Sequence, residues 1–164
     1  MQPPDEFDIR FTEPNDILFL TRCFSQPGTC DDFPFGDDEK DDTLKNWIGF
    51  SKFKASLTGM MGTQACAIAT LFLMPYRKVA HHASFFIFVD PAYRHKGIGT
   101  PMVRNILNLP KPRFRLESVY AEVYEPSLLL PILEKQAFAQ IFRQDDYVRI
   151  NGQSRARILM EYFF

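Results

Sequence analysis

Residues 84–103, SFFIFVDPAYRHKGIGTPMV, join an apolar run to a positively charged, glycine-rich turn. The first six residues are apolar almost without alternation, which is typical of a strand that is covered on both faces. After the turn, apolar side chains recur at the spacing of a helix, at Ile98, Met102, Ile106 and Leu109. We therefore predict a buried strand over 82–89, then the turn, and then a helix that ends near Leu109, before Pro110.

The turn itself has the composition of an anion-binding site. A helix N-terminus presents unpaired backbone N–H groups and the positive end of its dipole. Gly97 and Gly99 carry no side chains, so a phosphate can approach the backbone closely. Arg94 and Lys96 add positive charge at the rim. An ordinary glycine-rich helix start is the alternative interpretation.

Two common phosphate-binding motifs do not fit this turn. A dinucleotide-binding fold has a third glycine where this chain has Met102, and it places the motif in an early βαβ unit. A Walker A loop needs a Lys-Ser/Thr pair after the second glycine, and Thr100-Pro101 does not supply one. The turn therefore indicates an anion, such as a pyrophosphate, held in a different fold.

The rest of the chain predicts strands and helices of one domain over residues 1–164. Alternation, apolar runs and turn residues predict strands at 7–11, 55–61, 64–74, 82–89, 118–124, 142–150 and 157–164. Further helices are expected after Thr12, after Asp38 and over 127–136. This order of elements predicts a three-layer mixed α/β fold.

Composition argues against several classes of protein. The 19 Lys and Arg residues nearly balance the 20 Asp and Glu residues, so no global basic field indicates nucleic-acid binding. Cys23, Cys30 and Cys66 lack C-x-x-C spacing, which argues against a disulfide framework and a zinc site. The first residues form no apolar signal segment, and no run reaches the ~18 apolar residues of a membrane span. We expect a cytoplasmic protein that binds neither nucleic acid nor membrane.

An acidic cluster, Asp38-Glu39-Lys40-Asp41-Asp42, opens the second expected helix. Acidic residues in a first turn complement the helix dipole, which gives them a structural role. The alternative is an acidic lip that attracts a cationic substrate.

The glycine turn also carries a family resemblance. Arg94-His95-Lys96-Gly97-Ile98-Gly99, after FIFVDPAY, resembles the Arg/Gln-x-x-Gly-x-Gly/Ala signature of the GCN5-related N-acetyltransferases (GNAT). LEKQAF (133–138) is similar to the family's Tyr-x-x-x-Gly-Phe segment, and the C-terminal YVRINGQSRARILMEYFF resembles the closing hairpin of members that act on small amines or amino acids. The resemblance covers nearly the whole chain. It implies a three-layer α/β (α+β) fold whose central twisted sheet is mixed, mostly antiparallel and flanked by about four helices.

The resemblance implies acetyl-CoA as the co-substrate. We expect no metal, because the three histidines and three cysteines are scattered without the spacing of metal ligands. The pyrophosphate would lie on the turn, at Arg94, His95, Lys96, Gly97, Ile98, Gly99 and Thr100. The pantetheine arm would pair with the edge of the preceding strand, at Ile87, Phe88 and Val89. The thioester would enter a gap between this strand and the strand at 118–124, with a backbone N–H near Val89 as the oxyanion donor.

Two residues are candidates for the base that takes a proton from the amine. One common family position falls at Ala83, which cannot serve, and another falls close to Glu122. His82 is the second candidate, because its unperturbed pKa lies near neutrality. A solvated strand residue is the alternative for Glu122, and a structural histidine is the alternative for His82.

The general acid departs from the family pattern. The usual tyrosine aligns with Leu133, which cannot donate a proton, and the glycine of the Gly-Phe pair aligns with Ala137. Either water protonates the thiolate, or Tyr124 or Tyr147 replaces the missing acid, or the domain binds CoA without efficient catalysis.

These observations predict an enzyme that transfers an acetyl group directly from acetyl-CoA to a primary amine, on a small molecule or an amino acid. The alternatives are a protein or peptide N-acetyltransferase and a non-catalytic CoA-binding domain. A homodimer is compatible with the resemblance.

Overall fold

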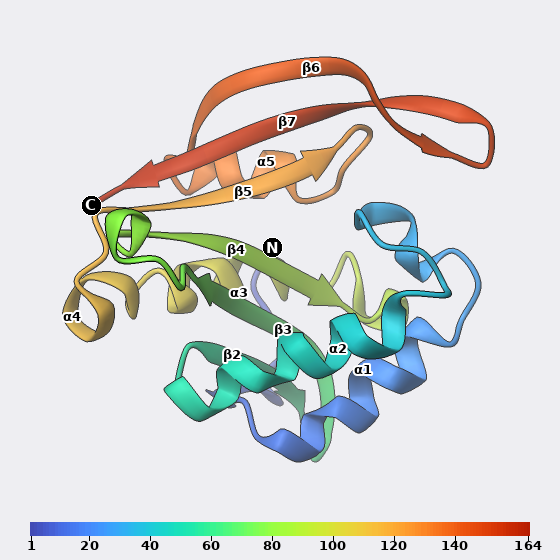
Figure 1. Cartoon of the computed structure of the whole chain (residues 1–164). Helices are drawn as coiled ribbons and strands as arrows, with labels where there is room; N and C mark the ends of the chain where they lie inside the picture. Colours follow the sequence, from blue (N-terminus) through green and yellow to red (C-terminus); the bar gives the residue numbers. More distant parts are fainter.

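Seven strands form one twisted sheet through the centre of the protein, in the order β1-β2-β3-β4-β5-β7-β6 (Figure 1). The structure, a computed structural model, describes residues 1–164. The strands are β1 (Phe7–Phe11), β2 (Ser56–Met61), β3 (Gln64–Leu73), β4 (His82–Val89), β5 (Ser118–Tyr124), β6 (Ala139–Ile150) and β7 (Gln153–Phe163). Only β4 and β5 pair in parallel; every other pair is antiparallel.

Helices cover both faces of the sheet. They are α1 (Ile17–Phe24), α2 (Lys40–Gly49), α3 (Gly99–Ile106), α4 (Pro110–Phe114) and α5 (Leu130–Lys135). One core, rich in Phe and including Trp47, lies between the sheet and the pair α1 and α2. The other core lies between the sheet and the pair α3 and α5. None of the helices has the length and apolar character that a membrane crossing requires. The predicted three-layer α/β fold with a mostly antiparallel sheet is confirmed.

Several element boundaries differ from the prediction. The helix after the glycine turn ends at Ile106, and Pro110 begins α4 instead of only ending the preceding helix. Proline suits the first helical position because its fixed φ is helical and its missing N–H would be unpaired there. The closing hairpin is also longer than predicted. β6 already pairs with β7 from Ala139 instead of from residue 142, and β7 begins at Gln153 instead of at residue 157.

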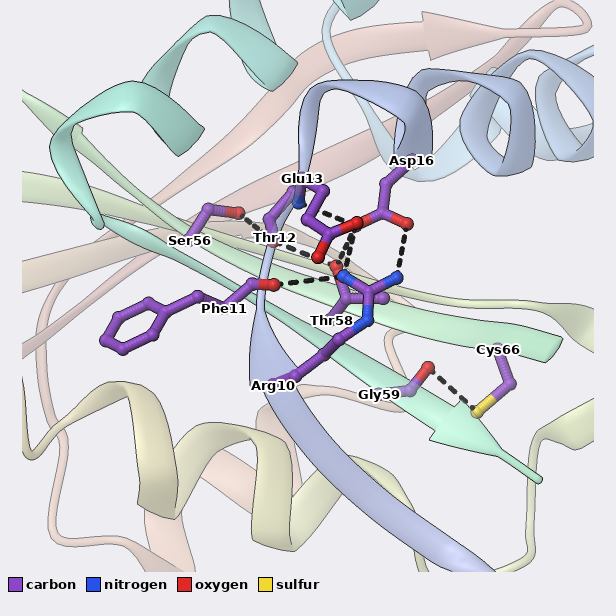
Figure 2. A network of polar contacts seen from close by, with 9 residues as sticks. All are labelled: Arg10, Phe11, Thr12, Glu13, Asp16, Ser56, Thr58, Gly59 and Cys66. Atoms are coloured by element: carbon purple, nitrogen blue, oxygen red, sulfur yellow. Dashed lines mark hydrogen bonds and ion pairs between the residues drawn. The ribbon is translucent and has the colours of Figure 1, made fainter. Parts of the chain in front are cut away.

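A buried polar network ties β1 to β2 and to the start of α1 (Figure 2). The Arg10 guanidinium donates from Nη1 and Nη2 to the two carboxylate oxygens of Asp16, each at 2.8 Å. Thr58 Oγ1 also donates to Asp16 Oδ2, at 2.8 Å, and lies 2.9 Å from Thr12 Oγ1. Burial by itself raises the pKa of Asp16, but the hydrogen bonds from Arg10, the Glu13 amide and Thr58 outweigh it and lower the pKa below its ordinary 3.8.

This network predicts a pH-dependent contribution to stability. We expect Asp16→Asn to lower the free energy of unfolding at pH 7 by about 1.5–3 kcal/mol, the range for hydrogen bonds to charged groups. Because the folded-state pKa is lowered, the contribution is complete above pH 3.8 and is lost as pH falls through that lower value. Thermal melts from pH 7 to pH 3 measure the effect, with the exposed Asp8→Asn as control. An equal loss of stability at pH 3 and pH 7 contradicts the assignment.

Candidate active site

Strands β4 and β5 separate partway along their length. They pair at only three positions, from His82↔Ser118 to Ser84↔Tyr120. Beyond this point β4 continues beside β3 as far as Val89, and β5 continues beside β7 as far as Tyr124. A gap therefore opens between the second halves of the two central strands, as the resemblance implied.

A cavity of about 510 Å³ lies at this gap. Its walls come from the end of β4 (85–89), the glycine turn (Arg94 to Thr100, without Lys96), the end of β5 (122–124) and the segment at 126–132. Asp32 and Phe33, from the loop between α1 and α2, close the side next to those helices. The fold therefore brings Glu122, the strand edge and the turn to one cavity.

The backbone of β4 is unpaired along this gap. The Asp90 N–H donates to Cys66 O on β3, and backbone direction alternates along a strand. The N–H and C=O groups of Ile87 and Val89 therefore point away from β3, into the gap. Val89 O accepts from Arg94 Nε at 3.1 Å. Phe88 differs, because its backbone faces β3 and its side chain is buried in the core below α1 and α2.

The glycine turn presents a row of free amides. His95 and Gly97 have φ of +59° and +76°, which turns successive N–H groups toward one side. None of the N–H groups from His95 to Thr100 donates to a backbone carbonyl. A Cβ on Gly97 would lie 2.9 Å from Gln2 O, so only glycine fits there. The turn and the N-terminus of α3 together have the backbone geometry of an anion site, and the binding of an anion there stays a prediction.

Glu122 is held by two neighbours on the same face of the sheet. Its Oε1 accepts from the Tyr124 hydroxyl at 2.7 Å, and its Oε2 accepts from Arg157 Nη1 at 3.1 Å. Burial, and then the hydrogen bond to Glu122, raise the pKa of Tyr124 above its ordinary value. Tyr124 therefore carries its proton at neutral pH, and its raised pKa makes it a weaker acid than an exposed tyrosine. Sequence reasoning missed Arg157, because its place beside Glu122 follows from the β5–β7 register alone.

His82 lies apart from this cavity. It stands where β4 and β5 still pair, opposite Ser118, and it does not line the cavity wall. Its Nδ1 lies 2.6 Å from Ser118 Oγ, which donates to Glu161 Oε1 at 2.5 Å. The two candidate bases therefore occupy different parts of the β4–β5 pair, and only Glu122 borders the cavity.

The candidate acids also occupy different environments. Leu133 is fully buried in the core against α3 and the sheet, so that family position offers no proton. Tyr147 is 44 % exposed and does not line the cavity, whereas Tyr124 is 3 % exposed and does. Ala137 adopts φ of +64°, a conformation that glycine, the residue of the family pattern at this place, can adopt at lower cost than alanine.

No group of three or more His, Cys, Asp or Glu side chains is arranged to hold a metal ion. The three cysteines are free, and burial raises the pKa of the Cys23 and Cys66 thiols to about 11. A reaction without a metal stays a prediction.

The sequence profile of the Acetyltransferase (GNAT) family matches residues 20–128. The match spans more than half of the chain, so the chain belongs to this family and is an acetyltransferase. A comparison with curated protein sequences gave no significant match.

Solved structures of the family share the fold. The yncA protein of Salmonella typhimurium, assigned as an acetyltransferase and solved with its cofactor acetyl-CoA, has a TM-score of 0.80 at 12 % identity, covering 97 % of this chain and 94 % of that chain. A GNAT acetyltransferase from Streptococcus pneumoniae has a TM-score of 0.80 at 16 % identity, covering 97 % and 100 %. A ribosomal-protein-alanine N-acetyltransferase from Brucella melitensis has a TM-score of 0.77 at 13 % identity, covering 96 % and 99 %. At these identities the likeness shows the fold alone.

The turn predicts that inorganic pyrophosphate stabilises the fold. A ligand that binds only the native state adds about 2.7 kcal/mol at a hundredfold excess over its Kd. Lys96→Glu reverses a charge at the rim, so we expect it to weaken or remove the shift in melting temperature. Lys111→Glu makes the same change on exposed α4 and serves as the control. An unaltered shift in Lys96→Glu would exclude the turn as the anion site.

Proposed function

We propose that this acetyltransferase uses acetyl-CoA and transfers the acetyl group directly to the primary amine of a small molecule or an amino acid. One observation carries the proposal: a single cavity joins the free amides of the glycine turn, the unpaired edge of β4 and the Glu122–Tyr124 pair. The free amides suit the anionic part of acetyl-CoA, the strand edge suits its extended arm, and the Glu122–Tyr124 pair suits the proton transfers of the amine.

The residues of the cavity fit acetyl-CoA by their chemistry. The amides from His95 to Thr100 would hold the pyrophosphate, because they are unpaired and lie at a helix N-terminus. The backbone of Ile87 and Val89 would pair with the pantetheine arm as an added strand does. The Val89 N–H would then stabilise the oxyanion that forms at the thioester carbonyl.

Glu122 and Tyr124 would handle the protons. Glu122 takes one proton from the incoming ammonium and passes it to water, and the neutral nitrogen attacks the thioester carbon. A C–N bond forms, the C–S bond breaks, and the nitrogen loses a second proton. Tyr124 donates a proton to the leaving thiolate and recovers one through Glu122, with which it shares a 2.7 Å hydrogen bond. One proton thus ends on sulfur and one in solvent.

The class of acceptor is the finer part of the proposal. The resemblance of the closing hairpin to members that act on small amines or amino acids supports a small acceptor. The 19 basic and 20 acidic residues nearly balance, so the protein has no large net charge to attract an oppositely charged protein partner. A protein or peptide N-terminus is the second candidate, and the fold shared with the Brucella ribosomal-protein-alanine N-acetyltransferase favours it.

A thiol-release assay with acetyl-CoA tests the activity across amines, amino acids and peptides with free N-termini. Transfer to small acceptors supports the proposal, and transfer only to peptides supports the second candidate. Binding of CoA without turnover of any acceptor would indicate a non-catalytic domain instead.

Glu122→Gln tests the base. This change keeps the shape of the side chain but removes the basic carboxylate, and general-base catalysis is worth about 10²–10⁴-fold. We expect kcat/KM to fall at least about a hundredfold near pH 7, with a smaller deficit at high pH, where the amine arrives deprotonated. The affinity for CoA should remain close to that of the wild type.

His82→Gln is the matched variant for the other candidate base. If His82 is the base, the ranking reverses: His82→Gln becomes the slow enzyme and Glu122→Gln stays within about threefold of wild type, far less than a base normally contributes. Paired pH–rate profiles of the two variants distinguish these outcomes.

Activity should also survive removal of metal ions. The transfer needs only a base, an oxyanion donor and an acid, which the cavity residues supply. Dialysis against a chelator should leave kcat unchanged. A loss of activity that added zinc reverses, but buffer alone does not, would contradict this mechanism.

A further inference from the structure

The charged side chains that line the cavity differ in sign from wall to wall. Arg94 and His95 are its basic residues, and both belong to the glycine turn. Asp32 and Glu122 are its acidic residues, and they come from the loop between α1 and α2 and from β5. The basic residues suit the anionic co-substrate, whereas the two carboxylates favour positive charge on the acceptor.

The two carboxylates lie on the same side of the sheet. Ala121 and Val123 point into the core below α3, so Glu122 between them points to the opposite face, toward α1 and α2. Asp32 belongs to the loop that joins these two helices. Asp32 and Glu122 therefore stand on different walls of one cavity, on the side from which an amine would reach the proposed base.

The Asp32 carboxylate is free to bind a further cation. Its ion pair with Arg94 measures 4.0 Å, which is longer than a hydrogen bond, and its side chain is 50 % exposed. Arg94 also lies at the rim of the proposed pyrophosphate site, so a bound pyrophosphate would give this guanidinium a second negative partner. Asp32 can then bind a cation without leaving Arg94 uncompensated.

Aromatic rings accompany the two carboxylates. Phe33 follows Asp32 directly, and its ring is stacked on that of Phe86 at 6.4 Å. Both rings line the cavity, and so does Tyr124, two residues after Glu122. An aliphatic chain can pack on such rings without burying a polar group, and ring faces also attract cations. This lining suits a short aliphatic chain with a positive group at each end.

The acidic cluster at 38–42 is not part of this lining. Asp41 and Asp42 lie in the first turn of α2, where they complement the helix dipole. The carboxylate that this region contributes to the cavity is that of Asp32, in the loop before the helix.

We propose that the acceptor is an aliphatic diamine, whose reacting amine is bound by Glu122 and whose second amine is bound by Asp32 as an ammonium ion. This inference rests on the proposed transfer to a small-molecule amine and adds the acceptor's second group. The reacting nitrogen forms the C–N bond and loses two protons, one to the leaving thiolate and one to solvent. The second nitrogen keeps its protons and its charge.

Matched acceptors test the proposal in the wild-type enzyme. 1,4-Diaminobutane and 4-aminobutan-1-ol share the chain and one amine, but only the diamine carries a second charge. Shorter and longer pairs are included, because the chain must match the separation of the two carboxylates. After correction for its two equivalent amines, we expect the best diamine to exceed its amino alcohol in kcat/KM by at least about tenfold, as a charge-assisted hydrogen bond predicts. If no diamine exceeds its amino alcohol, the proposal is wrong.

Variants assign this preference to Asp32. In Asp32→Asn the preference for the diamine should disappear, whereas Asp32→Glu should keep part of it, because glutamate retains the charge. Asp31→Asn makes the same change at the preceding residue, which neither lines the cavity nor forms an ion pair, and it should keep the full preference. A role of Asp32 in loop structure alone would slow both acceptors equally, so an unchanged ratio in Asp32→Asn overturns the assignment.

Calorimetry separates this inference from the proposed function. The diamines are titrated into the protein saturated with CoA, for wild type and both Asp32 variants. Binding that depends on Asp32, with no transfer to any amine, refutes the proposed function but supports the inference. Transfer to monoamines or amino acids without a preference for diamines supports the proposed function and refutes the inference. A wild type that neither binds nor acetylates any diamine of the series also refutes the inference.

Discussion

The two central strands are each paired more extensively with an outer neighbour than with each other. β4 follows β3 over seven register positions and β5 follows β7 over seven, whereas β4 and β5 share three. In a twisted sheet the two outer pairs diverge, and the edge of β4 that faces β5 is left without a strand partner beyond Ser84. Unpaired groups of this kind are costly when buried, so a ligand strand is the natural way to satisfy them. The site is thus a consequence of topology before any catalytic side chain is considered.

Packing on both faces keeps this opening in place. Phe33, Phe86 and Trp47 belong to the core below α1 and α2, which holds one side of β4. On the other side, α3 lies very close to the sheet: a Cβ on Gly59 would lie 3.0 Å from Met102 Sδ. This close approach lets α3 pack directly on the sheet, next to the turn that precedes the helix. The packing of α3, whose N-terminus carries part of the proposed anion site, therefore involves a glycine in a distant strand.

The sequence predicted what depends on local patterns and missed what depends on register. The strand at 82–89 and the amides of the turn follow from neighbouring residues, so both could be predicted. The contact between Glu122 and Arg157 joins residues 35 positions apart and depends on the pairing of β5 with β7. No local sequence pattern therefore predicts it. Leu133 could be recognised as a departure only through the family resemblance, and its burial then explains why it is apolar.

The loss of an acid at Leu133 changes how the proton chemistry is organised. In this chain the candidate acid and base are two residues apart on one strand, and they are joined by a hydrogen bond. Arg157, Glu122 and Tyr124 therefore form one connected row, in which the first contact restrains the carboxylate and the second, together with burial, raises the pKa of the tyrosine. In such a row a change at any member alters the other two, so their contributions are coupled rather than additive.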